Sequence, residues 1–583
     1  MRILLTAINA KYIHSNLAVY SLQAYAHAYR EQVELAEFTI NQDKDDILKG
    51  IFRRKPEVLC ISCYIWNISL VKELIKEIHK ILPGTDIWLG GPEVSFDAEK
   101  ILEEYSELTG IMKGEGEETF LELVQYYAGT GKTLANIPGI TYRRKDVTIS
   151  DRVIKDNGWR DVMDLSKIPF VYENLEKFEN RIIYYESSRG CPFSCSYCLS
   201  SVDKKLRFRD LDLVKKELQF FLDHKVPQVK FVDRTFNCHH DHAMEIWKYL
   251  VEHDNGITNF HFEVAADILT EDEISLIRTM RPGMIQLEIG VQSTNPETIR
   301  EIHRKMDLSR VAFNVERIRE KSNVHQHLDL IAGLPYEDYD SFGKSFNDVY
   351  QMKPQQLQLG FLKVLKGSYM NEMADVYGCC YHEKEPYEVL FTKWLPYEDL
   401  LKLKVVEEMT EVYYNSGQFL KTLPAAIRLF ESPFAFFQEL GNYYEKMGYM
   451  EISHTRIRRY EILLEFLRTK APKDINMYQE LMVFDLYLRE NMKSRPDWAM
   501  DLKPYKQVFR NFYQAEAKEH RFLKQYEEYD EKQTGKMTHI EVMHVHPDTL
   551  EPGEYLFLFD YKIRDTLTFA AKYQEITREC EEF

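Results

Sequence analysis

The stretch Cys191-Pro192-Phe193-Ser194-Cys195-Ser196-Tyr197-Cys198 contains three cysteines, with three and then two residues between them. It follows residues 182–186, an apolar run with the composition of a β-strand. A short loop at a strand end keeps its side chains close together, and thiolates are soft ligands that suit iron–sulfur clusters or zinc. The loop therefore predicts a metal-binding centre at the edge of a sheet.

The number of cysteines helps to decide between the two kinds of centre. A structural zinc site usually has four protein ligands, and no fourth cysteine or histidine lies near this loop in the sequence. Three thiolates on a [4Fe–4S] cluster leave one iron without a protein ligand, where a substrate can coordinate. The spacing thus favours a cluster, and a partial zinc site or three unrelated thiols are the alternatives.

Strands and helices alternate on the C-terminal side of the loop. Strand-like runs are 182–186, 228–232, 259–264, 284–289, 327–331 and 356–362, with helical patterns such as 211–222 and 296–302 between them. Six βα units within residues 181–370 predict an α/β fold of the partial (β/α)6 barrel type, whose active site lies at the carboxyl ends of the strands. The cysteine loop follows the first of these strands, so fold and site agree.

The loop and the barrel together resemble the radical S-adenosylmethionine (radical SAM) enzymes. Ser188-Arg189-Gly190 and Tyr197 belong to this likeness, and segments 231–237, 288–293 and 330–337 resemble the family's segments after the second, fourth and fifth strands. The resemblance implies that Cys191, Cys195 and Cys198 are the catalytic ligands of a [4Fe–4S] cluster. It also implies contacts with S-adenosylmethionine from Tyr197, Asp233, Arg234, Thr235, Glu288, Gln292, Ser293, Gly333, Leu334 and Pro335.

Residues 1–125 form another alternating series ahead of the loop. Its strand candidates are 2–8, 33–40, 57–63, 86–89 and 110–112, separated by helical patterns. Such alternation predicts a Rossmann-like parallel sheet covered on both faces, which binds ligands at the carboxyl ends of its strands. Loops 90–93 and 114–117 lie at that edge, and their glycines allow the backbone to approach a bulky ligand closely.

This first part resembles the cobalamin-binding domain that precedes the barrel in one large class of these enzymes, on stretches 15–20, 61–67, 89–95 and 114–117. His14 lies where many such domains have an axial histidine, but Tyr12 and Leu17 occupy the Asp and Gly positions of that motif. We therefore expect no histidine on the cobalt, with Tyr64 or Trp66 facing it instead. The resemblance implies cobalamin contacts from Asn9, His14, Ser62, Tyr64, Trp66, Gly90, Gly91, Glu93, Gly114 and Glu115.

The remaining segments carry weaker signals. Residues 126–180 are expected to form a connector. Residues 371–583 are expected to form a mostly helical domain that ends in a β-hairpin at 538–546 and 555–561, and they resemble a domain of unknown function. The run Cys238-His239-His240-Asp241-His242 and the basic stretch 456–473 are interpreted as a polar loop and a solvated helix face, with metal and RNA binding as the alternatives.

Composition restricts the class of protein. The 583 residues contain nine cysteines, 75 Lys+Arg and 93 Asp+Glu, which gives a net charge of −18. An odd and sparse set of cysteines disfavours a disulfide scaffold, and the acidic balance disfavours a protein held mainly by phosphate backbones. Because no long apolar run and no signal peptide are recognised, we expect a cytoplasmic protein without a membrane span.

The function follows from the resemblance. It implies reductive cleavage of S-adenosylmethionine to a 5′-deoxyadenosyl radical, with methylation of an unactivated carbon through methylcobalamin. A one-electron donor such as flavodoxin or ferredoxin would reduce the cluster. Rearrangement or cyclisation without methyl transfer, a non-catalytic corrinoid- or cluster-binding protein, and a tRNA methylthiotransferase are the alternatives. The sequence leaves open the substrate, which is a small molecule, a peptide or RNA, and the oligomeric state.

Overall fold

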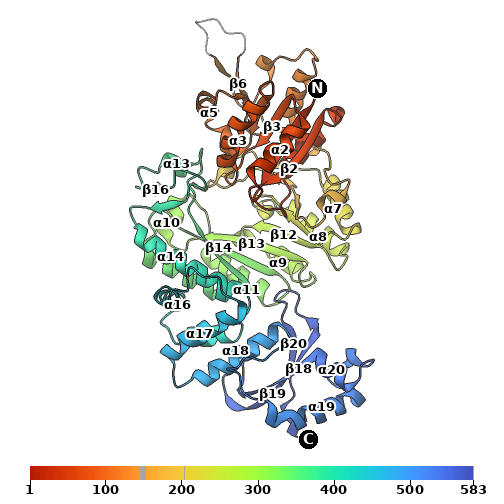
Figure 1. Ribbon diagram of the computed structural model, residues 1–583, viewed down its shortest axis with the longest axis vertical. Coiled ribbons are helices and arrows are strands. Elements are labelled where there is room, and N and C mark those ends of the chain that lie inside the picture. The colour runs from red at the N-terminus through yellow and green to blue at the C-terminus, as the bar shows by residue number, and fades with distance from the viewer. Residues whose placement is uncertain (145–152, 202–203, 582–583) are drawn as a thin grey trace.

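The computed structural model describes residues 1–144, 153–201 and 204–581. Three parts follow one another along the long axis of the molecule (Figure 1): an α/β sheet domain, an α/β barrel and a mostly helical C-terminal part. The first domain lies at one end and the C-terminus lies at the other. The predicted fold class is confirmed, because both expected parallel sheets are present.

The first sheet has its parallel strands in the order β2-β1-β3-β4-β5. Helices cover both of its faces, and α3 illustrates why: Ile68, Val71, Ile75 and Ile78 recur at helical spacing and are all buried. The strands are β1 (Ile3–Asn9), β2 (Val33–Thr39), β3 (Val58–Ser62), β4 (Asp86–Gly90) and β5 (Leu108–Met112). The helices are α1 (Leu17–Tyr25), α2 (Lys44–Arg54), α3 (Ile68–Ile81), α4 (Pro92–Ser95), α5 (Ala98–Glu104) and α6 (Glu117–Tyr127).

The expected connector, 126–180, also extends this sheet. It contributes β6 (Ile140–Arg143), which pairs antiparallel with β5, and β7 (Ile154–Asp156), which pairs antiparallel with β6. Each strand has only three or four residues, too few for a periodic pattern to reveal it in the sequence. Residues 145–152 of the polar stretch between them lie outside the described part of the chain.

The barrel sheet has six parallel strands in the order β15-β14-β13-β12-β11-β8. This sequential order, which does not pair β8 with β15, is that of the predicted partial barrel. The strands are β8 (Ile183–Tyr185), β11 (Gln228–Phe231), β12 (Asn259–Val264), β13 (Ile285–Gln292), β14 (His325–Ala332) and β15 (Gln356–Phe361). The helices are α7 (Leu211–Asp223), α8 (His240–Glu252), α9 (Glu271–Ile277), α10 (Pro296–Glu301), α11 (Leu308–Arg319) and α12 (Tyr339–Gln351).

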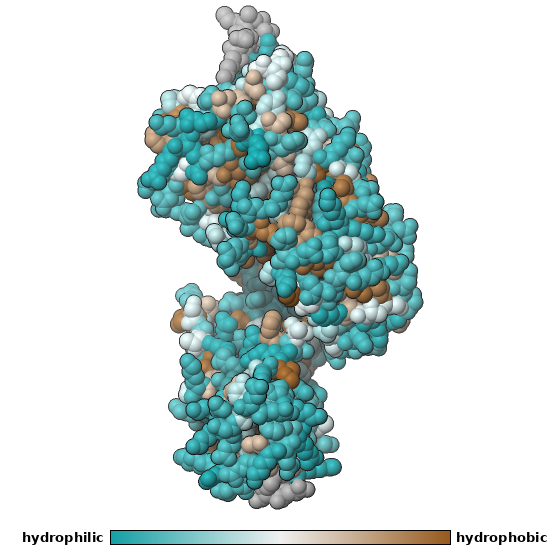
Figure 2. Space-filling view, turned by 90° about the vertical axis from the view of Figure 1, so that its right-hand side faces the viewer, coloured by the Kyte–Doolittle hydropathy of each residue, from teal (hydrophilic) through white to brown (hydrophobic). Residues whose placement is uncertain are grey.

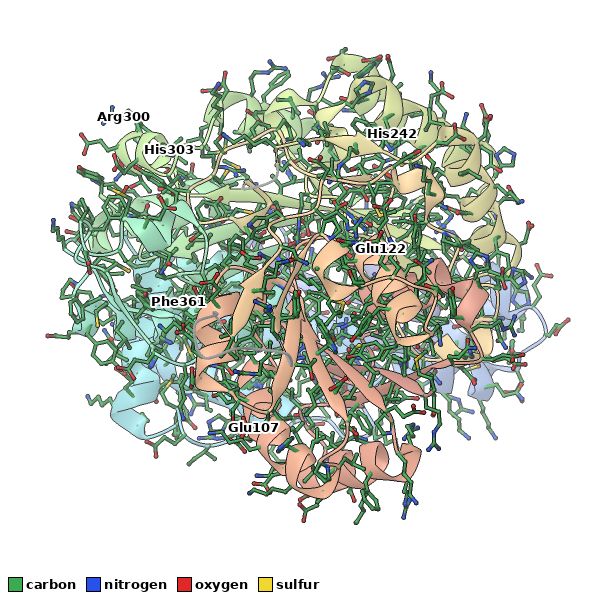
Figure 3. All side chains as sticks on the ribbon, turned by 90° about the horizontal axis from the view of Figure 1, so that it is seen from above. Glu107, Glu122, His242, Arg300, His303 and Phe361 are labelled. Carbon is green, nitrogen blue, oxygen red and sulfur yellow. The ribbon has the colours of Figure 1, made fainter. Side chains whose placement is uncertain are left out.

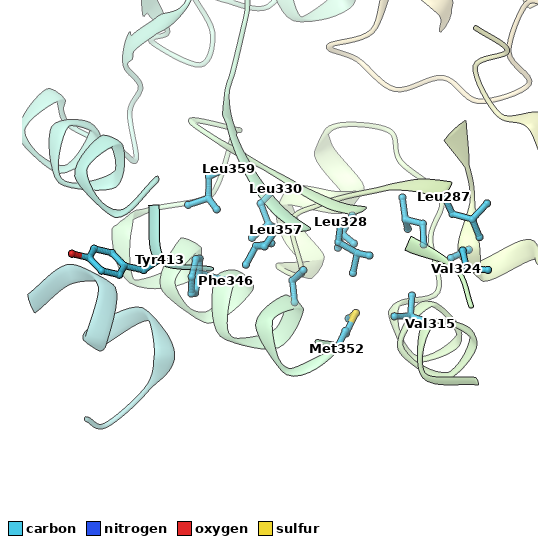
Figure 4. Packing of buried hydrophobic residues seen from close by; sticks show 14 of the residues in the cluster. Leu287, Val315, Val324, Leu328, Leu330, Phe346, Met352, Leu357, Leu359 and Tyr413 are labelled. Atoms are coloured by element: carbon cyan, nitrogen blue, oxygen red, sulfur yellow. The ribbon is translucent and has the colours of Figure 1, made fainter. Parts of the chain in front are cut away.

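The two faces of the barrel sheet differ in chemistry. Along β13 every second residue is buried and the residues between are half-buried. Figure 4 shows Leu287, Leu328 and Leu357 on the side that faces Val315 of α11 and Phe346 of α12. The core thus lies between sheet and helices, and the opposite, polar side of each strand faces the inside of the barrel.

The C-terminal part packs helices beside a small antiparallel sheet of order β18-β19-β20. The predicted hairpin corresponds to β18 (Thr538–Val545) and β19 (Pro552–Arg564), and the sequence did not predict β20 (Ala571–Glu575), which is short and mostly polar. A small hairpin, β16 (Cys380–Tyr381) and β17 (Val389–Phe391), follows the barrel. The larger helices are α14 (Tyr397–Thr410), α15 (Thr422–Ile427), α16 (Pro433–Met447), α17 (Arg456–Lys470), α18 (Ile475–Arg489), α19 (Lys506–Glu519) and α20 (Glu531–Met537).

The surface is mainly hydrophilic. Figure 2 shows a face with scattered apolar side chains and a narrow waist above the C-terminal part. Within the described ranges, no helix combines the length and the apolar composition that a membrane span requires.

Candidate functional site

The cysteine loop lies directly after β8 and the two-residue strand β9 (Ser188–Arg189). Cys191 and Cys195 are buried, whereas Cys198 is half-buried. The Sγ atom of Cys191 lies 3.7 Å from Oγ1 of Thr235, which follows β11. The structure therefore brings the loop to the carboxyl ends of the barrel strands, where the sequence predicted it.

Arg304 supplies positive charge beside the loop. Its Nη1 lies 3.7 Å from Sγ of Cys195 and 3.4 Å from the hydroxyl of Tyr197. Burial alone would lower the pKa of Arg304, but Tyr197 and Cys195 more than offset this and raise it. Burial raises the pKa of the Cys191 thiol, whereas hydrogen bonds from the Phe193 backbone and the Thr235 hydroxyl act to lower it.

The donor atoms of the loop fit an iron–sulfur cluster. Three thiols on one short loop, beside a guanidinium and two hydroxyls, form the soft ligand set that such clusters use. No three His, Cys, Asp or Glu side chains in the described ranges stand where they could hold a metal ion together. A four-iron cluster is wider than one ion and accepts thiols that stand farther apart.

Asp233 is fully engaged with protein groups. Its carboxylate accepts hydrogen bonds from the hydroxyls of Ser187 and Ser188, both at 2.6 Å, and from the Ser187 amide at 3.0 Å. His242 of α8, labelled in Figure 3, lies 3.0 Å from the Ser187 hydroxyl. Burial raises the pKa of Asp233 to about 6. The residue therefore fixes the end of β11 to the segment that leads into the cysteine loop.

A bulge at the end of β13 creates unpaired polar atoms next to the loop. The pairing register shifts between Gly290 and Gln292, and Gln292 adopts a left-handed backbone with φ of 74°. Among the described residues, neither its Oε1 nor the Nε of Arg304, both buried, has a hydrogen-bond partner. Buried polar atoms normally have partners, so this pair is suited to a bound polar ligand.

The other predicted contacts of the barrel have partners within the protein. The hydroxyl of Ser293 donates to Glu337 at 2.6 Å, and the carbonyl of Pro335 accepts from Thr298 at 2.9 Å. Gly333 has φ of 89° and approaches Val389 of β17 so closely that a Cβ atom would lie 2.7 Å from it. Leu334 belongs to the core, Arg234 is more than half exposed, and Glu288 bonds to Lys230 and His261.

In the first domain, His14 is turned toward the barrel. Its Nδ1 lies 2.6 Å from the hydroxyl of Tyr184 on β8, and its carbonyl accepts a hydrogen bond from Asn9 at 3.0 Å. Burial and the nearby charges of Lys11 and Lys230 lower the pKa of His14, so the ring is neutral at pH 7. The Nδ1 atom of His14 is thus committed to a contact between domains, and Nε2 takes no part in that contact.

Two aromatic rings lie at the carboxyl edge of the first sheet. Tyr64 and Trp66 stack with centroids 4.5 Å apart and an angle of 5° between planes. The Trp66 indole donates to the Ile8 carbonyl at 3.1 Å, yet 39% of the residue remains exposed. Ser62, at the end of β3, accepts from Asn16 at 3.3 Å. A flat, exposed aromatic surface at this edge fits a flat macrocyclic ligand.

Contacts within the protein explain why glycine occupies these loop positions of the first domain. A Cβ atom on Gly91, which has φ of 112°, would lie 2.4 Å from the Cys63 carbonyl oxygen, and one on Gly114 would lie 3.3 Å from Trp159. Gly90 lies against Met112. These glycines therefore allow two strand-end loops to pack together, and the predicted contact with cobalamin stays a prediction.

Both predicted glutamates of this edge also bind other parts of the chain. Glu93 is buried and accepts a hydrogen bond from Tyr387 of the C-terminal part at 2.8 Å. Glu115 lies 2.6 Å from Arg207 and accepts from the Met163 amide at 3.1 Å. Polar groups at this edge thus hold the neighbouring parts against the first domain.

Arg189 is the main ionic link between the first domain and the cysteine loop. Its guanidinium lies 2.9 Å from Glu117 of α6, 2.7 Å from Glu186 and 3.6 Å from Glu115. In the sequence, Arg189 and Glu117 stand out only within stretches that resemble known families, and Tyr184 and Arg304 were not predicted as site residues. Nothing in the sequence joins these partners, which lie far apart along the chain.

Three family models match successive parts of the chain. The B12 binding domain matches residues 3–124, the Radical SAM superfamily matches 185–349, and the protein of unknown function DUF4080 matches 375–559. The matches coincide with the first sheet domain, most of the barrel and most of the C-terminal part.

Two curated relatives are methyltransferases by name. The 2-(S-pantetheinyl)-carbapenam-3-carboxylate methyltransferase of Streptantibioticus cattleyicolor is 25% identical over 305 residues, 49% of this chain and 44% of that protein. The cobalamin-dependent radical SAM methyltransferase TokK of Streptomyces tokunonensis is 24% identical over 348 residues, 56% of this chain and 50% of that protein. The chain thus spans about half the length of the curated relatives it matches.

Among solved structures, the chain is similar to the cobalamin-dependent S-adenosylmethionine radical enzyme OxsB with aqua-cobalamin and S-adenosylmethionine bound. The TM-score is 0.57 at 15% identity, over 83% of this chain and 78% of that one. At this identity the likeness concerns the fold. With its three family matches in this order, the chain is a radical SAM protein with an N-terminal B12 binding domain and a C-terminal DUF4080 region.

Proposed function

We propose that the protein is a cobalamin-dependent radical SAM enzyme that methylates an unactivated carbon. The observation that carries the proposal is the ion-pair junction at Arg189, which ties the segment before the cysteine loop to the edge of the B12 binding domain. The two predicted cofactor sites are therefore neighbours, as a reaction that uses both cofactors requires. The names of the two relatives favour methyl transfer over other reactions of such a pair.

In this proposal Cys191, Cys195 and Cys198 ligate the cluster. When bound, the cluster supplies the electron that cleaves S-adenosylmethionine homolytically, and cobalamin carries the methyl group. Arg304 places its positive charge 3.7 Å from the Cys195 sulfur, where it attracts the negative charge of the cluster and its ligands. Burial of Cys191 and Cys195 keeps water away from this end of the loop.

We assign the unpaired Oε1 of Gln292 and Nε of Arg304 to S-adenosylmethionine. Asp233 and Ser293 act as positioning residues, since their side-chain oxygens are already held by protein groups. Tyr197, Arg234, Thr235, Glu288, Gly333, Leu334 and Pro335 keep their proposed contacts at the same strand ends.

For cobalamin, we assign the stacked rings of Tyr64 and Trp66 to the face of the corrin. His14 is not assigned to cobalt, because Tyr12 and Leu17 occupy the Asp and Gly positions of the axial-histidine motif. Asn9, Ser62, Gly90, Gly91, Glu93, Gly114 and Glu115 line the same edge as proposed contacts.

The reaction needs a one-electron reductant, and we propose a flavodoxin or ferredoxin in a reducing cytoplasm, where thiols stay free. Cys60, Cys63, Cys191 and Cys195 are buried free thiols.

Isotope transfer tests the function. Reconstituted protein, reductant and S-adenosylmethionine with a labelled methyl group are added to extracts of the host, and products are analysed by mass spectrometry. Formation of 5′-deoxyadenosine with labelled methyl on a new product supports methyl transfer. Formation of 5′-deoxyadenosine without label in any product indicates rearrangement or cyclisation. Absence of 5′-deoxyadenosine indicates a carrier and contradicts the proposal.

A further inference from the structure

The inner face of the barrel sheet is polar across four strands. In the sheet register, Lys230 of β11 lies beside His261 of β12. In the next row, Glu263 of β12 lies beside Glu288 of β13, which in turn lies beside His327 of β14. Closed barrels normally fill this space with branched apolar side chains. Here the side chains of Lys230, Glu263 and Glu288 expose 28%, 26% and 24% of their surface, so solvent reaches this face. The face suits a hydrophilic molecule.

Most charged groups on this face satisfy one another. Glu288 Oε2 accepts from Lys230 Nζ at 3.2 Å and lies 2.9 Å from His261 Nε2. Burial would raise the pKa of Glu288, but His261 and Lys230 more than offset it and lower that pKa to about 2. His327 Nε2 lies 3.0 Å from Asp329 Oδ1, a second ion pair, although these two atoms are not aligned for a hydrogen bond.

Glu263 differs from the paired charged groups on this face. Within the described part of the chain no group donates a hydrogen bond to its carboxylate, and its one ionic contact is with Arg234 at 3.7 Å. Arg234 is 56% exposed, so water screens its charge. Burial raises the pKa of Glu263 to about 7, as do Glu288 and Asp329, whereas Arg234 and Lys230 lower it. The carboxylate thus lies in the half-buried wall with one long ionic contact, to an arginine whose charge water screens.

We propose that the substrate of this barrel carries a protonated nitrogen, an ammonium or guanidinium group, that binds the Glu263 carboxylate. This rests on the proposed function only in naming the ligand a substrate. The remaining charges favour a cation here. Glu288 neutralises Lys230, and Asp329 neutralises His327. Glu263 is then left facing the exposed Arg234. A nitrogen cation would replace that contact with a short charge-assisted hydrogen bond.

Proton release accompanies such binding. A cation beside Glu263 stabilises the ionised carboxylate, so the ligand binds tightly above the pKa of about 7 and progressively more weakly below it. The charged groups around Glu263 are Arg234, Lys230, Glu288 and Asp329. Glu288, with a pKa of about 2, stays ionised between pH 6 and 8.

Calorimetry with agmatine, which carries one ammonium and one guanidinium group, tests the proposal on the full anaerobic chain with S-adenosylmethionine present. Wild-type protein is expected to bind agmatine about tenfold more tightly at pH 8 than at pH 6 and to release a proton to the buffer. Glu263→Gln should lose at least tenfold in affinity together with the pH dependence. Glu316→Gln, on the outer surface of α11, should behave as wild type, and uncharged 1,4-butanediol should not bind.

The proposal is overturned if wild-type protein does not bind agmatine, if Glu263→Gln binds agmatine equally well, or if butanediol binds equally well. Displacement of agmatine by S-adenosylmethionine also contradicts it, because Glu263 would then belong to the cofactor site. Formation of 5′-deoxyadenosine, measured separately, reports on the proposed function and does not depend on agmatine. Failure of the proposed cation site at Glu263 and failure of the proposed function are thus distinguishable.

Discussion

The Nη2 atom of Arg189 lies 2.9 Å from Oε1 of Glu117, an ion pair between the segment before the cysteine loop and the B12 binding domain. Only 6% of the Glu117 side chain and 21% of the Arg189 side chain are exposed. Removing one partner of a buried pair leaves the other charge uncompensated, which typically costs about 3–5 kcal/mol. The pair therefore controls how firmly the two halves of the site are held together.

Replacing Glu117 by glutamine should lower the free energy of unfolding by about 3 kcal/mol at pH 7, since Arg189 then keeps Glu186 at 2.7 Å and Glu115 at the longer distance of 3.6 Å. Denaturant unfolding monitored by circular dichroism measures this change. Glu99→Gln, at an exposed position of α5, serves as the control and should stay within about 0.5 kcal/mol of wild type. Equal stability of the two variants would show that the pair contributes nothing.

The same pair predicts a pH dependence. Burial would raise the pKa of Glu117, but Arg189 more than offsets this and the pKa lies below the ordinary value of 4.5. The stabilisation is therefore fully present above pH 4.5 and is lost as the pH falls through the lowered pKa. Wild-type stability should fall more steeply than that of Glu117→Gln as the pH drops below 5. Parallel curves would contradict the assignment.

Gly91→Ala should destabilise the apoprotein by about 2 kcal/mol or more, because the new Cβ meets the Cys63 carbonyl oxygen at 2.4 Å. Gly131→Ala is the matched control: φ is also positive, at 90°, but nothing lies within 4 Å. Thermal unfolding without cobalamin separates packing from ligand binding. If the two variants lose the same stability, the glycine is needed only for its backbone angle.

His14→Ala should retain cobalamin, because the motif that supplies an axial histidine is altered at Tyr12 and Leu17 and His14 is not assigned to cobalt. Electron paramagnetic resonance of the cobalt(II) form tests this directly. The wild-type and variant spectra should be alike, without nitrogen splitting from a histidine ligand. Nitrogen splitting that disappears in the variant would identify His14 as the lower ligand. Tyr184→Phe controls for loss of the domain contact alone.

The sequence predicted the elements whose residues repeat over several turns or strands. In β13, alternation of Leu287 and Ile289 with polar neighbours predicts a strand with one buried face, as observed. The strands β6, β7 and β20 have three to five residues each, so no period can be recognised. Their pairing depends on partners elsewhere in the chain.

The cysteine loop was predictable because its three cysteines are close together in sequence. Contacts between domains were not predictable, since Glu117 and Arg189 lie 72 positions apart in the sequence. Glu93 and Glu115 illustrate the resulting ambiguity: a polar residue at a strand end can serve a ligand or a neighbouring domain, and the observed partners are Tyr387 and Arg207. Local sequence does not distinguish the two uses.

Anaerobic reconstitution of the full chain with iron, sulfide and cobalamin tests the central claim that one chain holds both groups. The visible spectrum and the metal content should show one iron–sulfur cluster and one cobalamin per chain in the wild type. Cys195→Ala should lose the cluster and keep cobalamin, and Cys380→Ser, outside the loop, should keep both. Absence of either cofactor from the wild type, or a cluster that persists in Cys195→Ala, would contradict the account.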